Sequence, residues 1–398
     1  MSKATLSAAL VLAATLLSAC EPPPVDTVQR GYRGTGMVEV YRPARIAEAA
    51  AINTPPPPAP PLSVEGPKAK DIYQNVRVLG DLSIGQFTQT MLDITAWVAP
   101  TQGCAYCHNL QNLADDSLYA KVVSRRMFQM TQHLNANWKS HVAETGVTCY
   151  TCHRGANVPA SIWFRSAEAS QTRGLLGNKA GQNAPAIQVG LASLPNDPFT
   201  ELLGAGDEIR VVSTQALPNG TFPSLIKQTE RTYGLMMHMS QALGVNCTYC
   251  HNSRSFASWE MSTPQRATAY YGVRMVRDVN SNYLGSLAGV FPANRLGPTG
   301  DVPKVNCGTC HQGAYKPLYG ADIIDGHPGM RSGVSTLPAA ADATPGPSTA
   351  VPAPEPPAAG PDASGQSAPP PSATTAVVPG GPIAPPPAPT PVQPGASR

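Results

Sequence analysis

Charged and aromatic side chains are scarce in this chain of 398 residues, at 13% and 6%, and the formal net charge is only +3. Because no strong positive field results, we expect no nucleic-acid partner. Long apolar runs are missing beyond the N-terminus, so no later stretch has the length and apolar character of a transmembrane helix. Proline is abundant instead, with 43 residues concentrated toward the two ends, so the folded part is shorter than the chain.

The N-terminus, MSKATLSAALVLAATLLSAC, has the form of a secretory signal, because Lys3 precedes an apolar run too short to cross a bilayer. The end of this run, LSAC (17–20), resembles the bacterial lipobox, in which the cysteine is lipidated after cleavage. We therefore expect residues 1–19 to be a lipoprotein signal peptide and Cys20 to carry a lipid anchor. An ordinary signal peptide followed by an unrelated cysteine, or a signal anchor, is the alternative.

Composition divides the remaining chain into three parts. Residues 20–64 form an N-terminal extended segment, with short strands expected, and end in the proline-rich linker NTPPPPAPPLSV. Residues 337–398 are mostly Ala, Pro, Ser, Gly and Thr, a composition that buries too little apolar surface to fold, so we predict a disordered tail. The folded domain is then residues 65–336.

Apolar residues recur at helical spacing in four stretches of this domain. These stretches are 83–100, 115–138, 224–244 and 263–284. An acidic pair, Asp115 and Asp116, is read as a helix start, Gly244 as a C-cap, and Thr-Pro at 263–264 as another helix start. No convincing strand alternation is present, and 155–222 reads mostly as loop, so the predicted fold is mainly α with little β.

Eight of the nine cysteines fall into four CxxC pairs, each followed at once by histidine. The motifs are CAYCH (104–108), CYTCH (149–153), CTYCH (247–251) and CGTCH (307–311). In c-type attachment the two thiols add to one haem, and the next residue, histidine, lies under the iron as an axial ligand. We predict four covalently bound haem c groups on Cys104, Cys107, Cys149, Cys152, Cys247, Cys250, Cys307 and Cys310. The proximal iron ligands would be His108, His153, His251 and His311.

Two other readings of CxxC pairs fit less well. Zinc sites need further ligands in tetrahedral sets and do not require a histidine after every second cysteine. Disulfides or redox dithiols of an exported protein would not require that histidine either.

The motifs match in pairs, which indicates an internal duplication. CAYCHN matches CTYCHN, and GVTCYTCHRG matches VNCGTCHQG. The preceding helices also match, MTQHLNANW (130–138) with MVRDVNSNY (275–283). We therefore predict two pseudo-symmetric dihaem halves built from helix–loop–CxxCH units, at about 80–155 and 222–313.

Each iron needs a second axial ligand if the haems only carry electrons. The histidines outside the motifs are His133, His141, His238 and His327. Methionines on the helices before the motifs are Met91, then Met127 or Met130, then Met236, Met237 or Met239. Methionines on apolar helical faces commonly fill cores, so these residues are candidates only.

The lipobox, the four CxxCH motifs in two halves and the methionine-bearing helices together resemble the tetrahaem cytochrome c subunit of bacterial photosynthetic reaction centres. The likeness covers residues 20 to about 330, and TGVTCYTCHRG, LGVNCTYCHN and STPQRATAYYGVRMVRDVN carry it beyond CxxCH alone. It implies that Met91, Met127 and Met236 are the distal ligands of haems one, two and three. It also implies that His141 serves the fourth haem, opposite His311, and that Arg266 lies near haem three. The remaining His133, His238 and His327 are expected at the surface or around the haems without touching iron.

What the resemblance implies is an electron relay and not an enzyme. Because His141 beside motif two would serve haem four, the haem order would be one, two, four, three. Haem three would face the bacteriochlorophyll pair, and a soluble periplasmic carrier, a small cytochrome c or a high-potential iron–sulfur protein, would refill the chain. The protein would then be lipid-anchored at the periplasmic face of the photosynthetic inner membrane. The alternatives are a multihaem reductase, which needs one open iron, and a lipid-anchored cytochrome that serves another membrane oxidoreductase.

Overall fold

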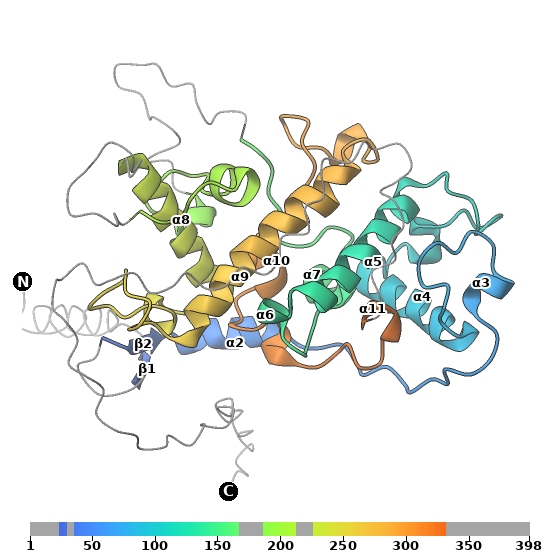
Figure 1. Cartoon of the computed structure of the whole chain (residues 1–398), viewed down its shortest axis with the longest axis horizontal. Helices are drawn as coiled ribbons and strands as arrows, with labels where there is room; N and C mark the ends of the chain where they lie inside the picture. Colours follow the sequence, from blue (N-terminus) through green and yellow to red (C-terminus); the bar gives the residue numbers. More distant parts are fainter. Residues whose placement is uncertain (1–23, 30–35, 167–185, 212–225, 332–398) are drawn as a thin grey trace, which may run out of the picture. The chain divides into compact units, whose positions relative to one another are not determined.

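The computed structural model describes residues 24–29, 36–166, 186–211 and 226–331 (Figure 1). The predicted signal peptide, Cys20 and the proline-rich tail lie outside the described residues. The described part is mainly helical, with one two-stranded antiparallel sheet of β1 (Asp26–Gln29) and β2 (Val38–Tyr41). Among the helices that the structure describes, none combines the length and apolar character that a membrane span requires.

The longer helices of the folded domain coincide with the stretches predicted from apolar spacing. They are α4 (Ile84–Val98), α5 (Tyr119–Asn137), α8 (Ile226–Leu243) and α9 (Pro264–Asp278), which continues as the π-helical η6 (Val279–Leu284). The short helices are α3 (Ala69–Ile72), α6 (Lys139–Val142), α7 (Cys149–His153), α10 (Cys307–His311) and α11 (Pro328–Arg331). The 3-10 and π turns are η1 (Gly103–Tyr106), η3 (Ile187–Val189), η4 (Thr200–Ala205), η5 (Cys247–Tyr249), η7 (Gly285–Leu287), η8 (Ala293–Arg295) and η9 (Pro317–Gly320).

Two of the predicted helix ends are correct and a third is wrong. Gly244 ends α8 with a φ of +64°, as a C-cap glycine should, and Pro264 is the first residue of α9. The acidic pair does not cap α5, because that helix begins at Tyr119 after an uncapped Leu118. Asp116 instead accepts a hydrogen bond from Arg125 on the helix, at 2.8 Å.

One helix, α2 (Pro43–Ile52), was not predicted. Ala49 is its one buried residue, so its sequence carries little of the apolar spacing that identifies a helix. It lies between the small sheet, which agrees with the short strands expected there, and the proline-rich linker.

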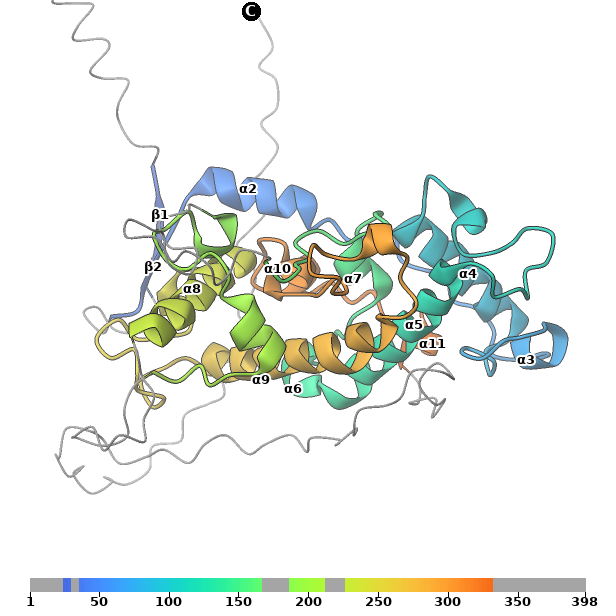
Figure 2. The same ribbon diagram turned by 90° about the horizontal axis from the view of Figure 1, so that it is seen from above.

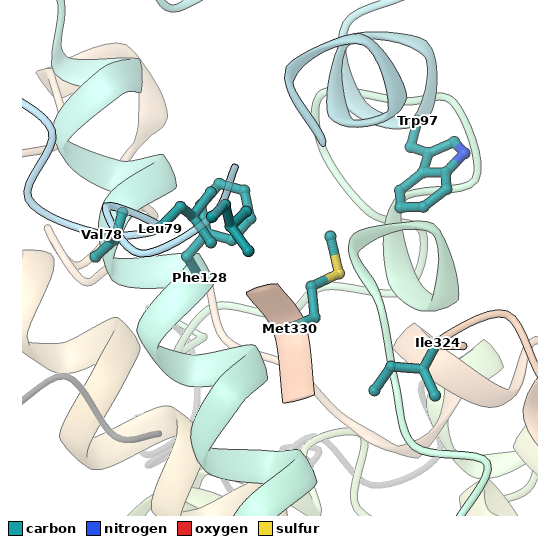
Figure 3. Close-up of a cluster of buried hydrophobic side chains, with 7 residues drawn as sticks. Val78, Leu79, Trp97, Phe128, Ile324 and Met330 are labelled. Atoms are coloured by element: carbon teal, nitrogen blue, oxygen red, sulfur yellow. The ribbon is translucent and has the colours of Figure 1, made fainter. Parts of the chain in front are cut away.

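Buried apolar side chains gather in three clusters between the helices. The first joins the end of α4 to α5 and α11, and consists of Val78, Leu79, Leu82, Trp97, Phe128, Ile324 and Met330. Figure 3 shows Val78 and Leu79 beside Phe128 of α5, with Met330 between this group and Trp97 of α4. The second lies between α5 and α9, and the third between α8, α9 and η4. These clusters fix the helices that present the predicted ligands.

The motif helices α7 and α10 contact each other, and each also packs on a longer helix, α7 on α4 and α10 on α8. Both views place α7 and α10 side by side, and Figure 2 shows α2 along one side of them and α9 along the other (Figure 1, Figure 2). The arrangement brings the second and fourth CxxCH motifs together, although 154 residues separate Cys307 from His153 in the sequence.

Candidate functional site

The four CxxCH motifs adopt two local conformations. The first and third motifs form 3-10 turns, η1 and η5, in which the N–H of His108 and of His251 donates to the carbonyl of the first cysteine at 2.9 Å. The second and fourth motifs are the single α-helical turns α7 and α10. The conformations therefore pair in the same way as the motif sequences.

Caps at both ends hold the α-helical motifs. In the second motif the backbone N–H of Thr148 donates to the hydroxyl of Thr151 at 2.9 Å. In the fourth motif the backbone N–H of Asn306 donates to the hydroxyl of Thr309 at 3.0 Å. Each turn ends in a left-handed residue, Arg154 with a φ of 49° and Gln312 with a φ of 47°. The caps thus hold both ends of the turns that carry the cysteines and the histidine.

All four motif histidines use Nδ1 in the same way, as donor to a nearby backbone carbonyl. The distances are 3.0 Å from His108 to Leu113, 2.8 Å from His153 to Ala156, 3.0 Å from His251 to Phe256, and 2.9 Å from His311 to Ala314. Because a carbonyl only accepts, Nδ1 carries the proton and the Nε2 lone pair remains for a metal. This is the kind of hydrogen bond that orients histidines bound to metals.

Burial favours the neutral imidazole of three motif histidines, His153, His251 and His311. It lowers the pKa of His153, and it lowers that of His251 together with the nearby Arg266 charge. Burial, with a smaller effect of His141, lowers the pKa of His311 to about 4. A ligand histidine must be deprotonated, so the lowered pKa values of these three histidines suit a role as metal ligands.

Two of the motif thiols have strongly raised pKa values. Burial raises the pKa of Cys149 and of Cys307 to about 12. In the part of the chain that the structure describes, no three His, Cys, Asp or Glu side chains come together as a metal site. The eight motif cysteines are free of disulfides there.

The ring of His141 in α6 lies next to that of His311. The ring centroids are 6.0 Å apart, and Nδ1 of His141 donates to the carbonyl of Thr268 at 2.9 Å, which leaves its Nε2 free as well. Two imidazoles bound to one metal at about 2 Å, with each centroid roughly 1 Å beyond the nitrogen, would have centroids about 6 Å apart. The pair therefore fits an iron atom between two histidines.

The candidate methionines are half-buried and face the apolar clusters. Met91 packs on the first cluster, Met127 and Met130 on the second, and Met236 on the third. Met237 points elsewhere, since its methyl lies against Gly190. The structure brings Met127 and Met130 to the same cluster, so it does not choose between them.

The remaining histidines all lie inside the protein or in hydrogen-bonded pairs. His327 is 4% exposed, and both its nitrogens are used, Nδ1 with the carbonyl of Ile323 and Nε2 with Asp93, each at 2.9 Å. His238 is 7% exposed, its ring lies 4.7 Å from that of Phe199, and burial lowers its pKa to about 4. His327 and His238 were expected either at the surface or around the haems. Their burial rules out the surface position.

The second and fourth motifs are joined by reciprocal hydrogen bonds that the sequence did not predict. Arg154 Nη2 donates to the carbonyl of Cys310, and Gln312 Nε2 donates to the carbonyl of Cys152, both at 3.2 Å. Asn53, only 2% exposed, donates to the Gln312 carbonyl at 3.0 Å and accepts from Arg154 at 3.2 Å. Asn53 is the first residue of the proline-rich linker, and nothing in the neighbouring sequence predicts its contacts with Arg154 and Gln312.

The N-terminal sheet holds the third motif. Asn246, just before Cys247, donates to the carbonyl of Val40 at 2.7 Å, and Thr248 donates to the carbonyl of Val38, also at 2.7 Å. The carbonyl of Gly36 accepts from the backbone of Ser253, just after the motif, at 3.0 Å. The start of the described chain thus contacts the third, second and fourth motifs.

Arg266 lies beside the third motif. Its guanidinium carbon is 4.1 Å from the ring centroid of Trp259, and it donates to the Ser258 carbonyl and the Ser262 hydroxyl at 2.8 Å. Its charge contributes to the lowered pKa of His251.

CxxCH attachment motifs whose histidines donate from Nδ1 to a backbone carbonyl, set in a helical frame, define a c-type cytochrome. The chain belongs to the family described as photosynthetic reaction centre cytochrome C subunit, which matches residues 21–331. It is therefore an electron-transfer cytochrome with covalently bound haem c.

Three relatives named photosynthetic reaction center cytochrome c subunit are similar over most of their length. The protein of Rubrivivax gelatinosus (strain NBRC 100245 / IL144) is 58% identical over 321 residues, 81% of this chain and 87% of the relative. The protein of Thermochromatium tepidum is 48% identical over 349 residues, which cover 88% of this chain and 85% of the relative. The protein of Roseobacter denitrificans is 41% identical over 332 residues, which cover 80% of this chain and 89% of the relative.

Proposed function

We propose that this cytochrome carries four haem c groups and passes electrons through them to the photo-oxidised bacteriochlorophyll pair of a reaction centre. The observation that carries the proposal is the common state of the four motif histidines, each with Nδ1 bonded to a carbonyl and Nε2 free. Four such sites, rather than one, suit a relay. The family membership supplies the reaction centre as partner.

The CxxCH motifs supply the proposed proximal iron ligands, and the resemblance to the family supplies the distal ones. His108, His153, His251 and His311 are the proximal ligands, and Met91, Met127, Met236 and His141 the distal ligands of haems one to four in that order. The paired rings of His141 and His311, 6.0 Å apart, support the fourth assignment most directly. A thioether ligand raises the potential of haem iron, so the haem with two histidines has a lower potential than its neighbours.

Equivalent hydrogen bonds support two dihaem halves, at about 80–155 and 222–313. Asn135 exchanges two hydrogen bonds with the backbone of Val147, at 2.9 and 2.7 Å, two residues before Cys149. Asn280 does the same with Val305, at 3.0 and 2.8 Å, two residues before Cys307. A duplicated unit explains why one helical asparagine holds the start of one motif in each half.

The contact between α7 and α10 supports the haem order one, two, four, three. These helices carry the second and fourth attachment sites, and Arg154 and Gln312 tie them together. Haems two and four are then neighbours, and haems one and three lie at the ends. The haems supply the redox chemistry, while the chain fixes their spacing, excludes water and provides the axial ligands.

The N-terminal contacts support a position of haem three near the membrane. If Cys20 carries the lipid, the six residues to Asp26 reach at most about 20 Å, and β2 and Gly36 hold the third motif. The anchor then lies close to haem three, at the periplasmic face of the photosynthetic membrane. Haem one is the distal end, where a soluble carrier, a small cytochrome c or a high-potential iron–sulfur protein, delivers electrons.

Flash-induced haem oxidation in isolated membranes tests the proposal. We expect one flash to oxidise a haem of this cytochrome and the soluble carrier to reduce it again. Membranes that contain the cytochrome and active reaction centres but show no haem oxidation would contradict the photosynthetic role, and would favour service to another membrane oxidoreductase. A high-spin haem in the resting protein would favour a reductase instead.

A further inference from the structure

The helices α5 and α9 correspond residue for residue. Their asparagines, Asn135 and Asn280, make the same paired hydrogen bonds to the segment before an attachment motif. Counting back eight residues from each asparagine gives Met127 on α5 and Gly272 on α9. The position that offers a thioether to haem two therefore has no side chain in the second half.

The imidazole of His141 occupies the space that a side chain on Gly272 would fill. A Cβ built on Gly272 would lie 2.5 Å from Cε1 of His141 and 2.7 Å from its Nδ1. Cβ atoms do not approach other atoms this closely, and here the neighbour is a ring that is itself held by a hydrogen bond to Thr268. A methyl group at this position would have to move the ring.

Neither backbone conformation nor helix formation explains a glycine here. Gly272 is buried within α9, and it is not among the residues with positive φ. Glycine destabilises a helix interior relative to alanine, so the helix itself would favour another residue. The close approach of His141 is the feature of the structure that requires it.

We propose that Gly272 is a positioning residue that gives the fourth haem two histidine ligands, because its missing side chain opens the place from which His141 reaches the iron opposite His311. This inference rests on the proposed function, in which His141 is that ligand. Haem two then has a methionine ligand because α5 carries Met127, and haem four has a histidine ligand because α9 carries Gly272 at the equivalent position.

The test is Gly272→Ala in the full-length, haem-loaded cytochrome, read by electron paramagnetic resonance and redox titration of each haem. We expect loss of the low-spin signal of the bis-histidine haem and a shifted potential for that haem, with the three methionine-ligated haems unchanged. The matched control is Gly85→Ala, because Gly85 lies in α4 and a Cβ added there would meet nothing within 4 Å beyond its chain neighbours and the backbone of its own helix. All four haems should keep their signals in this control.

A double-variant comparison separates positioning from damage to the helix. His141→Ala alone should remove the bis-histidine signal, and Gly272→Ala added to it should change haem four no further. If the second substitution still alters haem four without His141, the effect comes through α9 and the inference is wrong.

The other outcomes distinguish the inference from the proposed function. If Gly272→Ala keeps the bis-histidine signal while His141→Ala loses it, Gly272 has no positioning role, and the ligand assignment stands. If His141→Ala keeps that signal, the ligand assignment itself is wrong, and the inference falls with it.

Discussion

His133 of α5 and Asp278 of α9 hydrogen-bond to each other, Nε2 to Oδ2, at 2.7 Å. In the proposed duplication they are equivalent residues, each two positions before the asparagine that holds an attachment motif. Equivalent residues of two related halves touch only close to the axis that relates them. The pair therefore marks where the proposed two-fold axis passes between the long helices.

This pair leads to a prediction about acid stability. Burial would raise the pKa of Asp278, but hydrogen bonds from His133, Asn282 and Trp138 outweigh it and hold the pKa below its usual range. A carboxylate with a lowered folded pKa stabilises the fold above its unfolded pKa of about 4 and loses that effect as the pH falls through the lowered value. We expect Asp278→Asn to lower the free energy of unfolding by about 1–2 kcal/mol at pH 7, with the difference closing below about pH 4.

Thermal unfolding of the haem-loaded protein across this pH range measures the effect. Asp81→Asn is the control, because Asp81 also has a lowered pKa, set by Lys70, but its side chain is 89% exposed. An exposed pair is screened by water and should matter little. Equal effects of the two substitutions would contradict the prediction.

Replacing His141 by methionine should raise the potential of one haem only. The substitution exchanges an imidazole for a thioether at the fourth iron, and thioether ligation favours the reduced state. Redox titration resolved by haem measures the shift, with the other three potentials as internal references. If the fourth haem retains bis-histidine spectra in His141→Met, His141 is not its ligand.

Met127 and Met130 can be separated by replacing each with leucine. Leucine has nearly the volume of methionine and costs less than about 1.5 kcal/mol in a core, so both variants should fold. We expect Met127→Leu to abolish the methionine–iron absorption band of haem two, and Met130→Leu to preserve it. The reverse result would move the ligand by one helical turn.

Replacing Asn53 by alanine should weaken the junction of the second and fourth motifs. Asn53 donates to Gln312 and accepts from Arg154 and from the backbone N–H of Leu318, so its loss leaves buried groups unpaired. We expect a loss of about 2–3 kcal/mol in the free energy of unfolding, followed by haem absorption in denaturant. Thr54→Ala, next to it and exposed, should change little.

The chemistry of the site could be predicted from the sequence because it is local. Two cysteines and a histidine within five residues act on one haem, and the helix ends at Gly244 and Pro264 follow from the properties of single residues. The contacts of Asn53 and Val38 could not be predicted, since each joins segments more than 200 residues apart. Gly272 is an intermediate case. Aligning the two matching helices shows that glycine replaces methionine there, but the contact with His141 is visible only in the structure.

The acidic pair at 115–116 shows why a local signal can mislead. Two carboxylates before an apolar run resemble a helix cap, but Asp115 is bonded to Ser117 in a turn, and Asp116 is engaged by Arg125 and Lys121. Only the tertiary arrangement decides whether a carboxylate meets a free backbone N–H or a basic side chain. The helix consequently starts later than its sequence indicates.

The hold of the N-terminal sheet on the third motif also bears on the order of folding. Val40 and Asn246 are separated by 206 residues, and closing so long a loop forms contacts late. We therefore expect β1 and β2, which pair with each other, to meet the third motif only after the second half has been made. Until that contact forms, Cys247 and Cys250 would remain accessible for haem attachment.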